Sequence, residues 1–128
     1  MSENTASVTL LGFELWNAFH ALLEAKFHEN PYDHRIAPSP IIAEILEKMA
    51  NVIGASGLGG KEWAQWLELA PDRREWRVAL NHVRLEQEWL DEPHANRVEY
   101  AKRLLSPFRV GETLIERFLS EALEMKRV

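Results

Sequence analysis

Apolar side chains recur at helical spacing near the start of the chain. Between about residues 8 and 28 they form two adjoining stripes, one of Leu11, Leu15, Ala18, Leu22 and Ala25, the other of Trp16, Phe19, Leu23 and Phe27. Glu14, Asn17 and Glu24 lie on the opposite side of the same helical projection. Because residues three and four apart share a helix face, this pattern predicts a long amphipathic helix with a wide buried side.

A second amphipathic pattern follows Ser39 and Pro40. Serine is a favoured N-cap and proline a favoured first helical residue, so we expect a helix to begin here. Its apolar face consists of Ile42, Ile45, Leu46, Met49, Val52 and Ile53. Gly54 is the expected end of this helix, and the sequence GASGLGG predicts a flexible glycine-rich link over 54–60.

The segment 61–90 holds four of the five tryptophans, Trp63, Trp66, Trp76 and Trp89. The spacing of Trp63 and Trp66 predicts a short helix over 61–70, which Pro71 should end. Asp72 and Glu75 have the spacing of a capping box, and they predict a second helix that continues to Leu90. Apolar residues on two sides of this second helix indicate a central position in the molecule.

Two further helices are expected in the last third of the chain. One spans about 93–105 and directs Val98, Ala101, Leu104 and Leu105 inward. The other follows Thr113 and Glu116, which also have capping-box spacing. No alternating run of β-branched or aromatic residues predicts a strand. The expected fold is an all-α, single-domain irregular bundle of five to six helices, with a flexible tail over 1–7 and a proline-rich loop over 29–38.

Composition narrows the class of protein. A chain of 128 residues, 46% hydrophobic and 27% charged, is typical of one globular domain. Its net charge of −5 disfavours binding to nucleic acid, and the lack of cysteine excludes disulfides and thiolate chemistry. No basic leader and no run of about 20 apolar residues is present. We therefore expect a cytoplasmic protein with no membrane span.

The glycine-rich link invites two catalytic interpretations, and the spacing opposes both. In a phosphate-binding loop that ends in Gly60 and Lys61, a hydroxyl residue should replace Glu62. A nucleophile elbow around Ser56 requires glycine where Leu58 stands. Both motifs also follow a strand, whereas a helix is expected here. We therefore predict no cofactor at this link.

Histidines and carboxylates provide a candidate metal site. His20, Glu24 and His28 follow one another at intervals of four residues, and His82 and Glu86 repeat that interval on the central helix. Together these side chains could hold zinc or iron if the two helices faced each other. The spacings of established zinc and di-iron helical motifs are absent. Solvated side chains are the favoured interpretation, and a metal-binding helical-bundle enzyme or sensor remains the alternative.

Basic residues between 73 and 109 suggest nucleic-acid binding as a second alternative. This segment contains many arginines and one lysine, but Glu75, Glu86 and Glu88 accompany them. The last helix cannot act as a recognition helix, because Glu116 and Glu121 would repel phosphates. Arginines balanced by nearby carboxylates are the favoured interpretation, so nucleic acid is not the expected partner.

Aromatic and apolar residues outside the main stripes favour protein binding. Leu85, Trp89, Tyr100 and Phe108 belong to this group, and Arg77, Arg84 and Arg103 could form its rim. Aromatic residues surrounded by arginine are typical of interface centres. We therefore predict a non-enzymatic regulator, adaptor or inhibitor that contacts another protein or a second copy of itself as a homodimer.

Overall fold

The chain folds into helices joined by irregular connections. The structure, a computed structural model, describes residues 4–127, and 65% of these residues are helical. Within those residues the elements are α1 (Gly12–Lys26), α2 (Pro40–Ser56), α3 (Trp63–Leu67), α4 (Arg74–Leu85), the 3-10 helix η1 (Trp89–Asp91), α5 (His94–Leu105) and α6 (Glu112–Arg127). No strand occurs there, so the predicted all-α bundle is confirmed.

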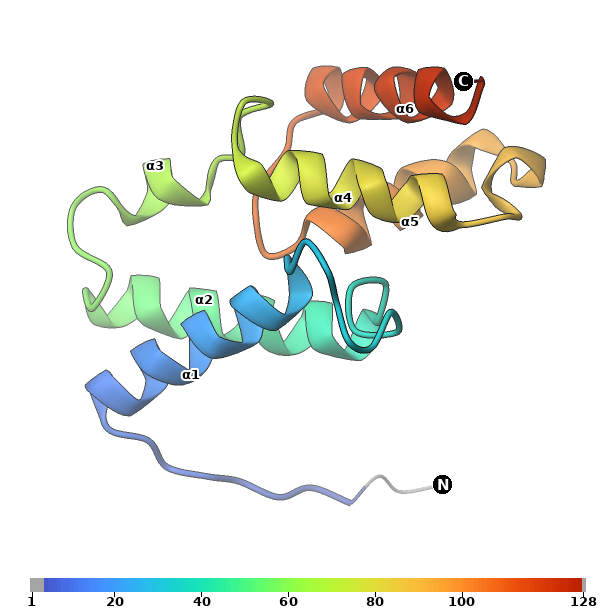
Figure 1. Cartoon of the computed structure of the whole chain (residues 1–128). Helices are drawn as coiled ribbons and strands as arrows, with labels where there is room; N and C mark the ends of the chain where they lie inside the picture. Colours follow the sequence, from blue (N-terminus) through green and yellow to red (C-terminus); the bar gives the residue numbers. More distant parts are fainter. Residues whose placement is uncertain (1–3, 128) are drawn as a thin grey trace.

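The helices form two layers. Helices α1 and α2 lie side by side in one layer, α4, α5 and α6 form the other, and α3 lies at the edge between them (Figure 1). The contact between α2 and α5 joins the layers. Side chains from both layers are completely buried in the shared core, among them Phe19, Leu46, Val83, Leu105 and Phe118. Each such side chain contributes about 1.5–3 kcal/mol of transfer free energy.

Tryptophans anchor α3 to the first layer. The rings of Trp63 and Trp66 stack with centroids 5.1 Å apart, and Trp16 of α1 approaches Trp63 at 5.9 Å. The indole Nε1 of Trp63 donates a hydrogen bond of 3.2 Å to the carbonyl of Ala50 in α2. These contacts explain why a helix of only five residues is stable here, since isolated helices of this length are not.

The predicted end of this helix at Ala70 is wrong by three residues. Helix α3 ends at Leu67, and Glu68 is extended. The backbone N–H of Leu69 donates to the carbonyl of Arg109, and the N–H of Arg109 donates to the carbonyl of Leu67. This short parallel bridge to the connection between α5 and α6 replaces the last helical turn.

The prediction of one central helix from Asp72 to Leu90 is also wrong. The N-cap of α4 is Arg73 rather than Asp72, and the helix ends at Leu85. The ammonium group of Lys126 in α6 donates to the carbonyls of Arg84 and Glu86 and thereby caps the end of α4. The chain then turns and forms η1 as a separate element.

Other predicted boundaries differ by a few residues. Helix α1 begins at Gly12, four residues later than expected, and the carboxylate of Glu14 accepts the N–H of Leu11 at its start. Helix α2 continues past Gly54 and ends before Gly57, whose φ of 76° lies in the left-handed region that glycine tolerates. Thr113 lies inside the first turn of α6, so it is not the N-cap.

The predicted irregular segments have different outcomes. The proline-rich loop over 29–38 contains turns and no helix, whereas the first three residues of the link over 54–60 belong to α2. Of the tail, residues 4–7 are exposed and non-helical, and residues 1–3 lie outside the described part. Among the helices of residues 4–127, none combines the length and apolar character that a membrane crossing requires.

A buried lysine links the two layers. Lys26 at the end of α1 is only 2% exposed, and its ammonium group donates to the carbonyls of Arg103 at 2.6 Å and Ser106 at 2.5 Å. The hydroxyl of Ser106 donates to the carboxylate of Glu47 in α2 at 2.9 Å. These bonds join α1, α2 and the end of α5 around one polar cluster.

Candidate binding site

A cavity of about 320 Å³ opens where α4, η1 and α5 meet. This volume lies within the range of small-ligand sites, about 300–1,000 Å³. We call it the α4–α5 pocket; its walls are Glu86, Glu88, Trp89, Glu92, Asn96, Arg97, Glu99, Tyr100 and Arg103.

The connection after α4 builds one side of the pocket. Because the chain leaves the helix at Glu86 and returns as η1, Trp89 is directed back toward α5. Arg97 of α5 holds η1 in place: its Nε donates to the carbonyl of Trp89 at 3.1 Å and its Nη2 donates to the carbonyl of Leu90. The guanidinium also lies 4.7 Å from the centre of the Trp89 ring, a cation–π distance.

Two buried hydrogen-bond donors in the pocket walls have no partner among the described residues. They are the indole Nε1 of Trp89, which is 2% exposed as a residue, and the hydroxyl of the half-buried Tyr100. Buried polar groups are normally paired, and leaving one unpaired costs about 1–3 kcal/mol. Two such groups on residues that line one cavity favour a site in which a hydrogen-bond acceptor reaches them.

The electrostatics keep Tyr100 a donor. Burial and, to a smaller extent, the charge of Glu86 raise the pKa of its hydroxyl to about 12, against an opposing effect of Arg103. The phenol therefore stays protonated at neutral pH. Its O–H is available to an acceptor over the whole physiological range.

The pocket is acidic. Four carboxylates line it, those of Glu86, Glu88, Glu92 and Glu99, against the two guanidinium groups of Arg97 and Arg103. None of the four forms a salt bridge with another described residue. Carboxylates therefore outnumber guanidinium groups in the walls, so the pocket favours a cation.

The structure brings three of the predicted partner-binding residues together. Trp89, Tyr100 and Arg103 all line the α4–α5 pocket. Leu85 is 59% exposed and lies beside it in a separate shallow hollow that also includes Glu86. Part of the predicted partner-binding group therefore lines one cavity, and Leu85 lies outside it.

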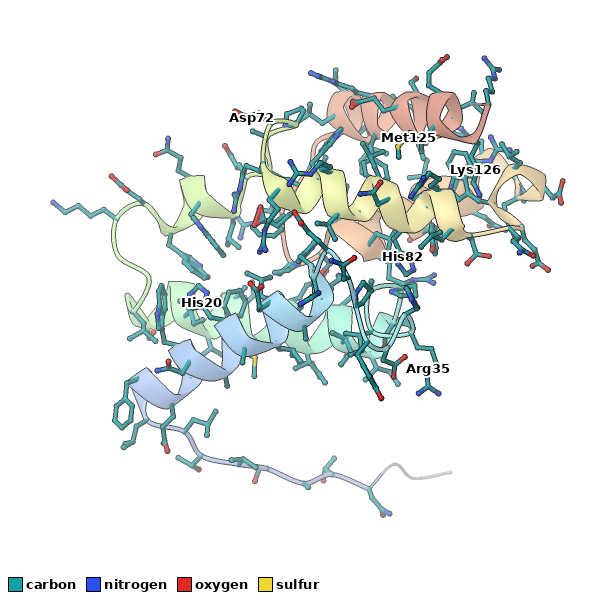
Figure 2. All side chains as sticks on the ribbon, in the orientation of Figure 1. His20, Arg35, Asp72, His82, Met125 and Lys126 are labelled. Carbon is teal, nitrogen blue, oxygen red and sulfur yellow. The ribbon has the colours of Figure 1, made fainter. Side chains whose placement is uncertain are left out.

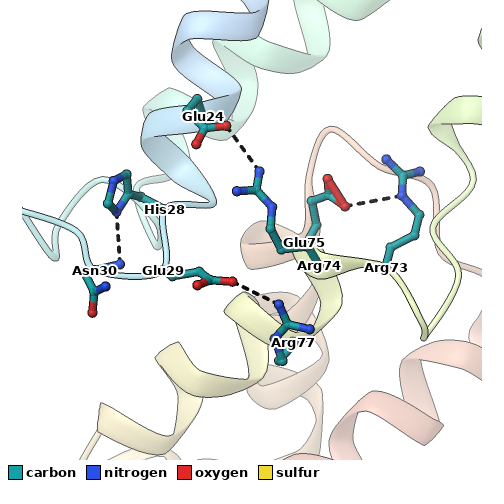
Figure 3. Close-up of polar contacts among 8 residues, drawn as sticks. All are labelled: Glu24, His28, Glu29, Asn30, Arg73, Arg74, Glu75 and Arg77. Atoms are coloured by element: carbon teal, nitrogen blue, oxygen red, sulfur yellow. Dashed lines mark hydrogen bonds and ion pairs between the residues drawn. The ribbon is translucent and has the colours of Figure 1, made fainter.

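The remaining predicted residues lie elsewhere. Phe108 is only 6% exposed and packs against Phe27, with ring centroids 5.6 Å apart, so its ring belongs to the core. Arg77 on α4 forms a salt bridge of 2.9 Å with Glu29 in the loop after α1 (Figure 3). Arg84 is exposed near the end of α4, and its carbonyl accepts from Lys126. These three residues do not line the α4–α5 pocket.

The residues proposed for a metal site are dispersed. His20 lies among aromatic rings, 4.4 Å from Trp16 between centroids, and burial lowers its pKa. Glu24 pairs with Arg74 at 3.2 Å, and the Nδ1 of His28 accepts the N–H of Asn30 (Figure 3).

The second pair lies in another part of the fold. His82 and His20 are far apart (Figure 2). Burial lowers the pKa of His82, the charge of His34 lowers it further, and Glu86 opposes both. Across residues 4–127, no group of three or more histidine or acidic side chains is arranged to hold a metal ion.

Carboxylates balance the first arginines of the basic segment. Arg73 pairs with Glu75 at 3.3 Å, and Arg74 and Arg77 pair with Glu24 and Glu29 across the space between α1 and α4 (Figure 3). These ion pairs lower the positive potential that a phosphate backbone would meet.

Several pocket residues were not predicted from the sequence. They are Glu88, Glu92, Asn96, Arg97 and Glu99. One signal was present, because Asn96, Tyr100 and Arg103 have the spacing i, i+4, i+7 that places polar residues on one helix face. The role of Arg97 carried no local signal, since the carbonyls it binds are free only because η1 is not part of α4.

Comparisons with known proteins provide no relative from which the role of the pocket could be transferred. Neither a family model, nor a curated protein, nor a solved structure matches this chain.

Proposed function

We propose that the protein is a non-enzymatic cytoplasmic helical protein that binds a basic segment of a partner protein in the α4–α5 pocket. The observation that carries this proposal is the pair of buried, unpartnered donors, Trp89 Nε1 and Tyr100 Oη, on two residues that line an acidic cavity. Binding of this kind would suit a regulator, adaptor or inhibitor.

A basic peptide supplies the hydrogen-bond acceptors and the cation that the pocket residues can bind. Its main-chain carbonyls are hydrogen-bond acceptors for the Trp89 and Tyr100 donors. A lysine or arginine side chain can pair with Glu86, Glu88 or Glu99, whose carboxylates form no salt bridge within residues 4–127. Because the Trp89 and Tyr100 donors are already buried without a partner, pairing them recovers free energy at little additional desolvation cost.

The chemistry of the walls supports binding over catalysis. Carboxylates, guanidinium groups, one amide, one phenol and one indole line the pocket, and no serine, threonine or histidine is among them. The walls therefore lack a nucleophile paired with a neutral base. Recognition of a cation with neighbouring acceptors is what this arrangement supports best.

Selection from a library of random short peptides tests the proposal. The immobilised wild-type protein should enrich lysine-rich and arginine-rich sequences. Each of two substitutions, Tyr100→Phe and Glu86→Gln, should then weaken the selected peptides about tenfold, the equivalent of one lost hydrogen bond or ion pair of about 1.4 kcal/mol.

Matched controls lie outside the pocket. Tyr32→Phe makes the same chemical change at a fully exposed tyrosine, and Glu124→Gln removes a surface carboxylate on α6. Both variants should bind the selected peptides as tightly as the wild type does. Enrichment without basic residues, or equal affinity for the wild type and Tyr100→Phe, would reject the proposal.

A further inference from the structure

Two apolar surfaces of this chain are left uncovered. One is the N-terminal arm (residues 4–11) with the first turn of α1, where Val8 is 81%, Leu11 61% and Phe13 66% exposed. The other is the outer face of α2, where Ile41 is 67% and Val52 54% exposed. Exposed large apolar side chains scattered singly are ordinary, but grouped ones mark an interaction surface.

The outer face of α2 carries exposed apolar side chains over its whole length. Ile41, Ile45 and Val52 follow one another at i, i+4 and i+11, which places them on one side of the helix, away from the buried Leu46 and Ile53, with the exposed Lys48 between Ile45 and Val52. The ion pair between Glu44 and Lys48, 3.2 Å apart, belongs to this outer part of the helix. Since its charges cancel, it does not repel a like surface.

The arm matches the outer face of α2 in length and position. It leaves α1 at Gly12, which lies next to Leu58 just beyond the end of α2. Figure 1 shows the arm extended and separate from the body, running along the side of the first layer. Its eight residues span roughly 26 Å when extended, and the 17 residues of α2 span about 25 Å.

We infer that the protein forms a two-fold symmetric dimer in which the N-terminal arm of each copy covers the outer face of α2 in the other. The single chain leaves both surfaces in water, whereas an exchange of arms buries both at once. Such a dimer is closed, because each copy provides one arm and one face.

The available area suits such a dimer. Seven large apolar side chains contribute, Val8, Leu10, Leu11, Phe13, Ile41, Ile45 and Val52. Their exposed surface is on the order of 700 Å² per chain, close to the roughly 800 Å² per partner of a standard stable interface. The surface is separate from the α4–α5 pocket, so this inference does not depend on the proposed peptide binding.

Sedimentation velocity over a range of concentrations tests the inference. The wild-type chain should sediment as a dimer. An arm variant, Val8→Glu, and a face variant, Val52→Glu, should each dissociate at least tenfold more readily. Leu85→Glu is the matched control, because it places the same charge at a leucine on α4 that is 59% exposed, close to the 54% of Val52, and it should remain dimeric. Circular dichroism checks that all three variants keep their helical content.

Mixing the two variants distinguishes an arm bound to a face from two faces in contact. In the mixed dimer, the intact arm of the Val52→Glu chain meets the intact face of the Val8→Glu chain. Because one glutamate is enough to break a contact, each variant alone keeps no intact contact and the mixed dimer keeps one, so the mixture should associate more tightly than either variant alone. A monomeric wild type, which includes the case of an arm folded onto its own α2, overturns the inference. So does a mixture with no gain in association.

Discussion

The ammonium group of Lys26, at the end of α1, donates a hydrogen bond of 2.6 Å to the main-chain carbonyl of Arg103 in α5. A second bond reaches the carbonyl of Ser106, so one side chain links the two helical layers. Burial and, to a smaller extent, the guanidinium of Arg103 lower the pKa of Lys26 from 10.5 to about 7, against an opposing effect of the Glu47 carboxylate.

This depressed pKa predicts a stability that depends on pH. The unfolded chain holds the Lys26 proton up to about pH 10.5, whereas the folded chain releases it near pH 7. Between these values the unfolded state binds more protons, so the free energy of unfolding should rise with pH by up to a few kcal/mol. Lys26→Met should abolish this rise. Urea titrations at several pH values between 7 and 10 measure it.

An exposed lysine on α2 provides the control. The side chain of Lys48 is 73% exposed, so Lys48→Met should keep the wild-type slope of stability against pH. Lys26→Met should also be the less stable of the two at pH 10 by roughly 2 kcal/mol, because two buried carbonyls lose their donor. Parallel slopes for wild type and Lys26→Met would show that the amine is not desolvated as described.

Gly59 is expected to be intolerant of any side chain. A Cβ at this position would lie 2.6 Å from the ring of Trp63, which is buried and hydrogen-bonded to Ala50. Gly59→Ala should therefore lower the free energy of unfolding by about 1–3 kcal/mol, as overpacking does. Gly111→Ala is the matched control, since nothing lies within 4 Å of its Cβ. Equal stabilities of the two variants in thermal unfolding would contradict this account.

Tyr100 should resist ionisation. In a Tyr32→Phe background, which leaves a single tyrosine, we expect no phenolate absorbance below about pH 11, because the pKa of Tyr100 is raised to about 12. Glu86→Gln removes a charge that opposes ionisation and should move the titration to lower pH. Ultraviolet absorbance during alkaline titration follows this directly. A midpoint near 10 in the folded protein would place the hydroxyl in water.

Arg73 should not be replaceable by lysine. Its guanidinium donates to the carbonyl of Trp66 at 2.6 Å and lies 4.6 Å from the centre of the Phe108 ring. A planar guanidinium makes both contacts at once and an ammonium group cannot, so Arg73→Lys should destabilise the fold by about 1–2 kcal/mol. At the neighbouring Arg74, which forms only a surface ion pair, the same substitution should change stability by less than about 0.5 kcal/mol. Denaturant unfolding of both variants measures the two losses of stability, and equal losses would contradict this account.

Local signals in the sequence predicted the regular elements well. Ser39 caps α2 as expected, with its hydroxyl accepting the N–H of Ile42, and Pro40 is the first residue of the helix. The helix predicted over 93–105 is observed at His94–Leu105. Both results depend on residues within one or two turns of each other, which is the range of capping and of helical periodicity.

The α4–α5 pocket could not be predicted from such local signals. Leu85, Trp89 and Tyr100 stood out as residues outside the main stripes, but an uninterrupted helix to Leu90 would not have formed the cavity. Its formation depends on Lys126, which ends α4, and on Arg97, which holds η1. Lys126 is distant in the sequence from the end of α4, and Arg97 lies on a different element from η1, so no local sequence pattern predicts these contacts.

Lys26 illustrates the same division. Its position at i+7 from Phe19 and i+3 from Leu23 places it on a buried stripe, and this much is present in the sequence. That a lysine is stable there follows only from the carbonyls of Arg103 and Ser106, about 80 residues away. The sequence by itself determined which segments are helical, because helix formation and the burial of one face depend on near neighbours. Tertiary structure decided where helices end early, which polar groups are buried with partners and which face an open cavity, because those outcomes depend on contacts between distant segments.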